Sequence, residues 1–241
     1  MKGDAKDDGV KDGVRGAGVR SAAGRNGGVS DAGMTHTGGN GALSDAGMMH
    51  ASGNDAVSGA VTPPERLVLV RHGETDWNQE RRLQGRTDNP LNGVGRAQAR
   101  KAGRLLAAEP WSVVVSSPLQ RAVQTAHLIA DAAGLQPAGT IPELIERDYG
   151  PAEGLHLNGL TEPQLTSALG IGEPEQAVAD RGLAALRGLA AQYPGQRIIA
   201  VAHGTLIRLT LSELTGQRYP RVLNGEVVEV PLAALLDSSP V

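Results

Sequence analysis

Short apolar runs and longer amphipathic stretches alternate along residues 61–241. Three runs are rich in β-branched residues, and we interpret them as buried strands: Arg66–Arg71, Ser112–Ser116 and Arg197–Ala202. A fourth run, Val227–Val230, is short and predicts a strand at the edge of a sheet. The longer stretches between these runs have the length and pattern of helices.

Four such stretches predict helices. Asn92 is expected to cap a helix that ends near Ala108 and carries Leu105 and Leu106 on its apolar face. Pro118 is expected in the first turn of a second helix, where its missing backbone N–H does no harm. The first helix follows Asn92, and the second starts at Pro118 and stops at Gly134. The third spans Glu175–Gln192. The fourth spans Thr205–Leu214 and is closed by Gly216.

Strands that alternate with helices are typical of an α/β fold. The pattern predicts a mainly parallel sheet covered by helices on both faces, which is a three-layer α/β/α architecture. In sheets of this kind ligands bind beyond the carboxyl ends of the strands. The residues that directly follow each strand are therefore the first place to look for a functional site.

Residues 1–60 differ in composition from the rest of the chain. They contain 15 of the 33 Gly and all four Met, but no aromatic residue, no Ile and a single Leu. Such a segment cannot bury enough apolar surface to offset its chain entropy, so we expect a disordered Gly-rich extension at 1–60 and a folded domain at 61–241. Because the folded part has no Met, a further hypothesis is that translation starts at Val61 from a GTG codon and that the extension is not native.

Composition and charge exclude several classes of function. A formal net charge of -3 favours neither nucleic-acid binding nor membrane-surface binding. We find no apolar run long enough for a signal peptide or a membrane span. The absence of Cys rules out thiolate nucleophiles and cysteine-ligated metals. We therefore expect a cytoplasmic protein that binds neither nucleic acid nor a membrane.

Arginine and histidine residues gather where the predicted strands end. Arg71 ends the first strand and His72 follows it, Arg121 lies one turn into the helix after the second, and His203 and Gly204 follow the third. Guanidinium groups match phosphate oxygens, and glycines let backbone amides approach a phosphate closely. A neutral imidazole is a competent nucleophile, and neighbouring guanidinium charges keep its pKa low. Taken singly, each residue could instead serve in a salt bridge or a helix cap, but together they predict a phosphate pocket.

Four blocks in order along the chain resemble the histidine phosphatase superfamily, which includes phosphoglycerate mutases and many small-molecule phosphatases. A bare RHG tripeptide would be weak evidence, whereas ordered blocks are specific. The blocks are LVRHGETDWNQERRLQGRTDNPLNGVGRAQA (69–99), SSPLQRAVQTA (116–126), the acidic loop PELIERDYG (142–150) and VAHGTLIR (201–208). The resemblance covers most of Arg66–Val230 and implies a phosphoglycerate mutase-like fold.

The resemblance also implies a role for each matching residue. His72 is the implied nucleophile that becomes phosphorylated, and Glu146 is the implied general acid. Glu143, three residues earlier in the same loop, is the alternative acid. The implied catalytic and phosphate-binding partners of His72 are Arg71, Asn78, Arg121, His203 and Gly204. No metal or other cofactor is implied, because arginine and histidine meet the phosphate charge.

The blocks resemble the phosphatase branch of the family more closely than the mutase branch. We therefore expect a phosphatase that acts on a small phosphomonoester, such as a sugar phosphate or a phosphoglycerate. One alternative is a phosphoglycerate mutase-type phosphotransferase, which must exclude water from a closed site. Little chain separates Glu146 from His203, which leaves little room for an extensive lid. A second alternative is a phospholigand-binding protein without catalysis.

Overall fold

The structure, a computed structural model, describes residues 62–237. The predicted disordered extension at 1–60, and with it the hypothesis of a start at Val61, lies outside the described residues. Within the described part of the chain a five-stranded sheet has the strand order β3-β2-β4-β1-β5. The strands are β1 (Arg66–Arg71), β2 (Val113–Ser116), β3 (Gly139–Thr140), β4 (Arg197–Ala202) and β5 (Val227–Glu229).

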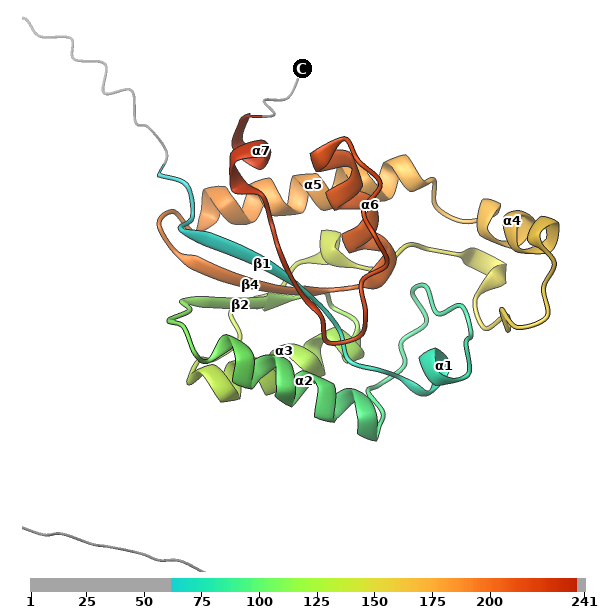
Figure 1. Ribbon diagram of the computed structural model, residues 1–241, viewed down its shortest axis with the longest axis horizontal. Helices are drawn as coiled ribbons and strands as arrows, with labels where there is room; N and C mark the ends of the chain where they lie inside the picture. The colour runs from blue at the N-terminus through green and yellow to red at the C-terminus, as the bar shows by residue number, and fades with distance from the viewer. Residues whose placement is uncertain (1–61, 238–241) are drawn as a thin grey trace, which may run out of the picture. The chain divides into compact units, whose positions relative to one another are not determined.

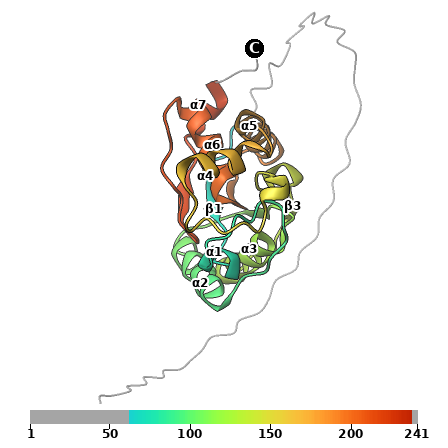
Figure 2. The same ribbon diagram turned by 90° about the vertical axis from the view of Figure 1, so that its right-hand side faces the viewer.

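Helices cover both faces of this sheet. The strands β1 to β4 run parallel, and β5 pairs antiparallel with β1 at one edge. The helices are α1 (Asp76–Gln79), α2 (Gly93–Leu106), α3 (Gln120–Ala133), α4 (Glu162–Gly170), α5 (Glu175–Gln192), α6 (Gly204–Thr215) and α7 (Leu232–Asp237). Two 3-10 turns, η1 (Pro142–Leu144) and η2 (Gly150–Ala152), lie between α3 and α4. In Figure 1, α2 and α3 lie below the sheet and α5 to α7 above it, and Figure 2 shows the same layers from the side. The expected three-layer α/β/α fold with a mainly parallel sheet is confirmed.

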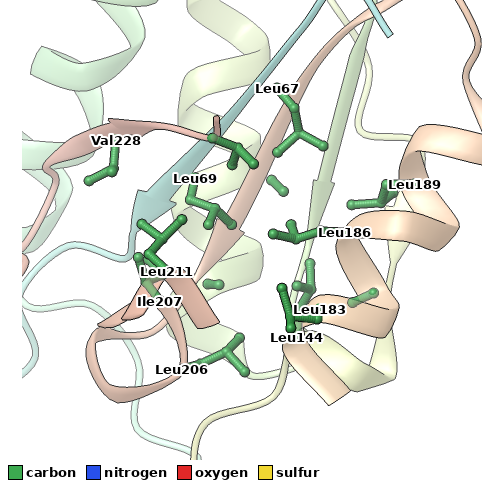
Figure 3. Close-up of a cluster of buried hydrophobic side chains, with 14 of the residues drawn as sticks. Leu67, Leu69, Leu144, Leu183, Leu186, Leu189, Leu206, Ile207, Leu211 and Val228 are labelled. Carbon is green, nitrogen blue, oxygen red and sulfur yellow. The ribbon is translucent and has the colours of Figure 1, made fainter. Parts of the chain in front are cut away.

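The central strand β1 sends its side chains alternately to two cores. Leu67 and Leu69 point to the face covered by α5 and α6, into the cluster drawn in Figure 3. Val68 and Val70 point to the opposite face, into the cluster formed with α2 and α3. All four side chains are at most 1% exposed, and burying one of this size stabilises the fold by about 1.5–3 kcal/mol. The sheet is therefore held from both sides, and the residues at its strand ends are held with it.

The sequence pattern predicts the strands closely. Arg66–Arg71 and Arg197–Ala202 are strands with the predicted bounds, and the second strand begins one residue later than expected, at Val113. The run at Val227–Val230 is the expected edge strand, although it ends at Glu229. The two-residue strand β3 is too short to carry an alternating pattern and was not predicted.

Two details of the predicted helices are wrong. Leu105 does not lie on the apolar face of α2 but is 64% exposed, because the buried stripe passes through Ala99, Ala102 and Leu106. Pro118 does not lie in the first turn of α3, since that helix begins at Gln120. The helix at Glu175–Gln192, the Asn92 cap and the two closing glycines are confirmed. Within residues 62–237 no helix has the length and apolar character needed to cross a membrane.

Candidate active site

A pocket opens at the carboxyl ends of the parallel strands, beside α1 and the start of α6. Its volume is about 1190 Å³. In Figure 1 this edge of the sheet faces α1 on the right of the picture. The pocket brings together six residues that the sequence predicted from separate segments, namely Arg71, His72, Asn78, Arg121, Glu146 and Gly204. His203, the seventh, is fully buried and packs against His72.

His72 directly follows β1 and is only 3% exposed. Its Nδ1 atom lies 2.7 Å from the carbonyl oxygen of Gly73. Because a carbonyl oxygen only accepts hydrogen bonds, Nδ1 carries the ring proton and Nε2 carries the lone pair. Nε2 accepts a hydrogen bond from Nε of Arg121 at 3.3 Å. Burial, followed by the charges of Arg121 and Arg71, holds the pKa of His72 well below its ordinary value, so the imidazole is neutral.

Close packing of two glycines fixes the backbone after His72. A Cβ atom on Gly73 would lie 2.2 Å from the carbonyl oxygen of Gly95, and one on Gly95 would lie 2.0 Å from that of Glu74. No larger side chain is compatible with this approach of the loop to the start of α2. The backbone N–H of Gly73 also donates to Oγ1 of Thr125 at 3.1 Å. The carbonyl group that binds Nδ1 of His72 is therefore held in place from two sides.

Arg71 and Arg121 bring two buried guanidinium groups to the pocket. Arg121 donates to the backbone carbonyls of Gly85 at 2.7 Å and Thr87 at 2.9 Å, and burial lowers its pKa to about 10. Arg71 donates to the carbonyl of Val222 at 2.8 Å, while its buried Nε has no hydrogen-bond partner within residues 62–237. Burial also lowers the pKa of Arg71. Two guanidinium groups that are costly to bury and incompletely bonded point to an anionic ligand.

His203 caps the N-terminus of α6 and lies beside His72. The two ring centroids are 5.1 Å apart and the ring planes are tilted by 58°. Nε2 of His203 is 2.7 Å from Oγ of Ser117, and its buried Nδ1 has no partner in the part of the chain that the structure describes. Burial, then the charges of Arg121 and Arg71, keep the pKa of His203 well below its ordinary value. A second neutral imidazole thus stands next to the first.

The acidic loop places its two candidate carboxylates in different surroundings. Glu146 lines the pocket, is 8% exposed and accepts hydrogen bonds from the backbone N–H groups of Thr205 at 3.2 Å and Leu206 at 3.0 Å. Glu143 is exposed in η1 and is not among the residues that line the pocket. Arg181 of α5 holds the loop between them by donating to the carbonyls of Ile145 and Glu146 at 2.6 and 3.2 Å.

Asn78 reaches the pocket from the short helix α1. Thr75 caps this helix, and its backbone N–H donates to Oδ1 of Asn78 at 3.2 Å. A second donor to the same oxygen is Nδ2 of Asn224, also at 3.2 Å. Asn224 belongs to no motif that the sequence singled out, although the Asn-Gly pair at 224–225 is a turn signal. Arg181 lies in the middle of a helical stretch and carries no local signal at all.

Further arginines surround the mouth of the pocket. Arg81 and Arg208 line it, and Arg208 pairs with Glu175 at 3.7 Å. Arg218 and Arg221 line it as well, and neither forms an ion pair within residues 62–237. The positive potential of the buried arginines therefore extends outward to the solvent. In the described part of the chain no group of three His, Asp or Glu side chains is arranged to hold a metal ion.

Comparison with known proteins agrees with this geometry. The family model of the histidine phosphatase superfamily (branch 1) matches residues 67–233. The chain therefore belongs to the histidine phosphatase superfamily. A relative described as uncharacterized phosphatase PhoE, from Bacillus subtilis (strain 168), is 39% identical over 150 residues, which are 62% of this chain and 77% of that protein.

Relatives in this family carry both phosphatase and mutase names. The metal-independent phosphoserine phosphatase of Arabidopsis thaliana is 36% identical over 180 residues, covering 69% of this chain and 76% of the relative. The probable phosphoglycerate mutase GpmB of Citrobacter koseri is 35% identical over 162 residues, covering 63% of this chain and 75% of the relative. Among solved structures, a mycobacterial glucosyl-3-phosphoglycerate phosphatase has a TM-score of 0.60 at 28% identity, covering 68% of this chain and 91% of that one.

Proposed function

We propose that the protein is a phosphatase that hydrolyses a small-molecule phosphomonoester through a phosphohistidine formed on His72. The observation that carries the proposal is the hydrogen bonding of this side chain. The proton on Nδ1 is bound by the carbonyl of Gly73, and the lone pair on Nε2 stands beside Arg121. A buried imidazole with a low pKa stays neutral and is therefore available as a nucleophile at neutral pH.

The reaction consists of two half-reactions with balanced proton transfer. First, Nε2 of His72 attacks phosphorus, the N–P bond forms and the bond to the leaving oxygen breaks. The carboxylic acid of Glu146 gives its proton to that oxygen, so the product leaves as a neutral alcohol. Then a water molecule attacks phosphorus and gives a proton to the Glu146 carboxylate. The N–P bond breaks, inorganic phosphate leaves and both residues return to their starting states.

The arginines and their neighbours stabilise the charge on the phosphoryl oxygens. Arg71 and Arg121 supply two buried positive charges, and the free Nε of Arg71 is a ready donor. The side-chain amide of Asn78, the backbone N–H of Gly204 and the ring of His203 supply the remaining contacts. With the charge met by protein groups, the reaction requires no metal or other cofactor. The proposed catalytic domain comprises residues 61–241.

Glu146 is the stronger candidate for the general acid. Its carboxylate lines the pocket and is held by two backbone N–H groups of α6, whereas Glu143 is exposed outside the pocket. A proton donor must reach the leaving oxygen, and of these two carboxylates Glu146 is the one that lines the pocket. The arginines at the mouth favour a substrate whose leaving group carries a further negative charge.

A mutase-type phosphotransfer is the second candidate, because relatives with mutase names share the same family. It would use the same phosphohistidine, but a second hydroxyl group of a bound substrate would replace water in the second half-reaction. The non-catalytic alternative requires loss of the nucleophile or the acid, and residues suited to both roles line the pocket. Catalysis is therefore better supported than phospholigand binding alone.

Hydrolysis of p-nitrophenyl phosphate and glycerol 3-phosphate in EDTA tests the proposal. We expect wild-type turnover in EDTA and a loss of about a thousandfold or more in His72→Ala. Glu146→Gln should lower turnover of glycerol 3-phosphate more than that of p-nitrophenyl phosphate, whose leaving group needs less protonation. Glu143→Gln is the matched control, since it makes the same change in the same loop outside the pocket.

Two outcomes would contradict the proposal. Full activity in His72→Ala would exclude His72 as the nucleophile, and activity abolished by EDTA would exclude a metal-independent reaction. A wild-type protein that hydrolyses neither compound but moves phosphate between the hydroxyl groups of phosphoglycerate would favour the mutase alternative.

A further inference from the structure

A tight turn at residues 222–226 is hydrogen-bonded to the end of β1 beside the pocket. Three hydrogen bonds join it to Arg71, one through the Arg71 side chain and two between backbone groups. The guanidinium group of Arg71 donates to the carbonyl of Val222 at 2.8 Å. The backbone N–H of Arg71 donates to the carbonyl of Glu226 at 3.1 Å. The backbone N–H of Gly225 donates back to the carbonyl of Arg71 at 2.9 Å. Gly225 has a φ of +74°, a conformation that glycine adopts without strain.

The side chain of Asn224, in the same turn, forms hydrogen bonds to two residues of the proposed site. Its Nδ2 atom donates to the backbone carbonyl of His72 at 3.1 Å and to Oδ1 of Asn78 at 3.2 Å. An amide nitrogen carries two protons, so both are used. One side chain thus links the backbone of the proposed nucleophile to the side chain of a proposed phosphate ligand.

These contacts determine which end of the Asn78 amide faces the pocket. Oδ1 of Asn78 accepts from the N–H of Thr75 and from Asn224, each at 3.2 Å. If the amide were rotated by half a turn, its NH₂ group would face these two donors and neither contact would survive. With the oxygen held, the NH₂ group is the end left for the pocket that Asn78 lines. A phosphoryl oxygen requires a donor there, and an amide oxygen in its place would repel it.

We propose that Asn224 is a positioning residue that orients Asn78 for oxyanion binding. The inference rests on the proposed function of the pocket but concerns a residue outside the family blocks, on a turn far along the chain. Asn224 itself contacts no phosphate. It acts through Asn78, and its effect therefore disappears when Asn78 is absent.

A double-mutant cycle tests this dependence. We expect Asn224→Ala to weaken binding of orthovanadate by about tenfold and Asn78→Ala by about thirtyfold, measured as the dissociation constant by calorimetry. The double variant should bind no more weakly than Asn78→Ala alone. Asn224→Asp, which has the same shape but offers no donors, should be worse than Asn224→Ala, because its acceptor oxygens favour the reversed Asn78 amide.

A purely structural role for Asn224 predicts different results. It would lower the thermal midpoint and leave the vanadate affinity of the folded protein unchanged, which would overturn the inference. Multiplying effects, with about three-hundredfold weaker binding in the double variant, would overturn it too. In turnover of p-nitrophenyl phosphate, we expect Asn224→Ala to raise KM as well as to lower kcat.

The two proposals fail in distinguishable ways. Vanadate binding that depends on Asn224 only when Asn78 is present, in a protein without turnover, would refute the proposed reaction and leave the positioning role intact. Normal turnover combined with independent effects of the two residues would refute only the positioning role. A wild-type protein that binds no vanadate would overturn the positioning role, and one that also shows no turnover would overturn both proposals.

Discussion

The two buried neutral histidines, His72 and His203, make the stability of the fold depend on pH. The pKa values of His72 and His203 lie well below their ordinary range, first because both are buried and then because of Arg121. In the unfolded chain both rings become protonated below about pH 6.5. The unfolded state therefore binds more protons than the folded state under these conditions. The stabilisation is present above that pH and is lost as the pH falls.

The size of the effect follows from this difference in proton binding. One unit below the unfolded pKa, protonation favours the unfolded chain by a factor of about 11 for each histidine, which is about 1.4 kcal/mol. If both rings stay neutral in the folded state, the two histidines together remove at most about 2.8 kcal/mol between neutral pH and pH 5.5. His72→Ala should cut this pH-dependent loss by about half. The cavity that the substitution leaves costs stability at both pH values and cancels in the comparison.

Urea unfolding at about pH 7.5 and pH 5.5 measures the effect directly. The quantity to compare is the drop in the free energy of unfolding between the two pH values, for wild type and for His72→Ala. His127→Ala serves as the matched control, because it removes an exposed histidine from α3, outside the pocket. Protonation of carboxylates lowers the free energy of unfolding by the same amount in all three proteins, so this contribution cancels in the comparison. An equal drop in wild type and His72→Ala would refute the reasoning, since His72 would then be protonated within the fold.

Two further predictions concern the arginines. Arg121→Lys keeps the charge but loses the hydrogen bonds to the 85–87 backbone, so kcat/KM for p-nitrophenyl phosphate should fall about a hundredfold, and unchanged kcat/KM would contradict the role of these bonds. Arg221→Gln should lower kcat/KM for 3-phosphoglycerate about five- to tenfold more than for glycerol 3-phosphate, which lacks the carboxylate. The control Arg104→Gln removes an equal charge from the exposed face of α2. If it lowered kcat/KM for 3-phosphoglycerate as much as Arg221→Gln does, only the net charge of the protein would matter.

The sequence predicts the strand ends well, for a physical reason. Buried parallel strands need short β-branched runs, and the residue after each run must lie at the carboxyl edge of the sheet. Local patterns therefore place His72 and His203 at the same edge of the sheet, and the pairing of β1 with β4 brings them together. Arg121 follows from the helix predicted after the second strand, and in the structure it lies in the first turn of α3.

Other parts of the site depend on contacts that no local pattern encodes. Glu146 and Glu143 share one acidic loop, and only the approach of α6 separates their surroundings. Asn224 meets Asn78 across 146 positions of sequence. The resemblance to a known family supplied Glu146 and Asn78, whereas Asn224 and Arg181 became visible only when the chain was folded.

The spacing of the two histidines has a consequence for how this protein can change. His72 follows β1 and His203 follows β4, and these strands are neighbours in register, with Arg71 opposite Ala202. Their ring separation of 5.1 Å is close to the distance of about 4.8 Å between adjacent strands. The backbone pairing of β1 with β4, which does not depend on the surrounding side chains, therefore brings the two rings together. Exposed side chains at the pocket mouth, such as those of Asn158 and Arg218, can therefore change towards new substrates while the reacting pair keeps its geometry.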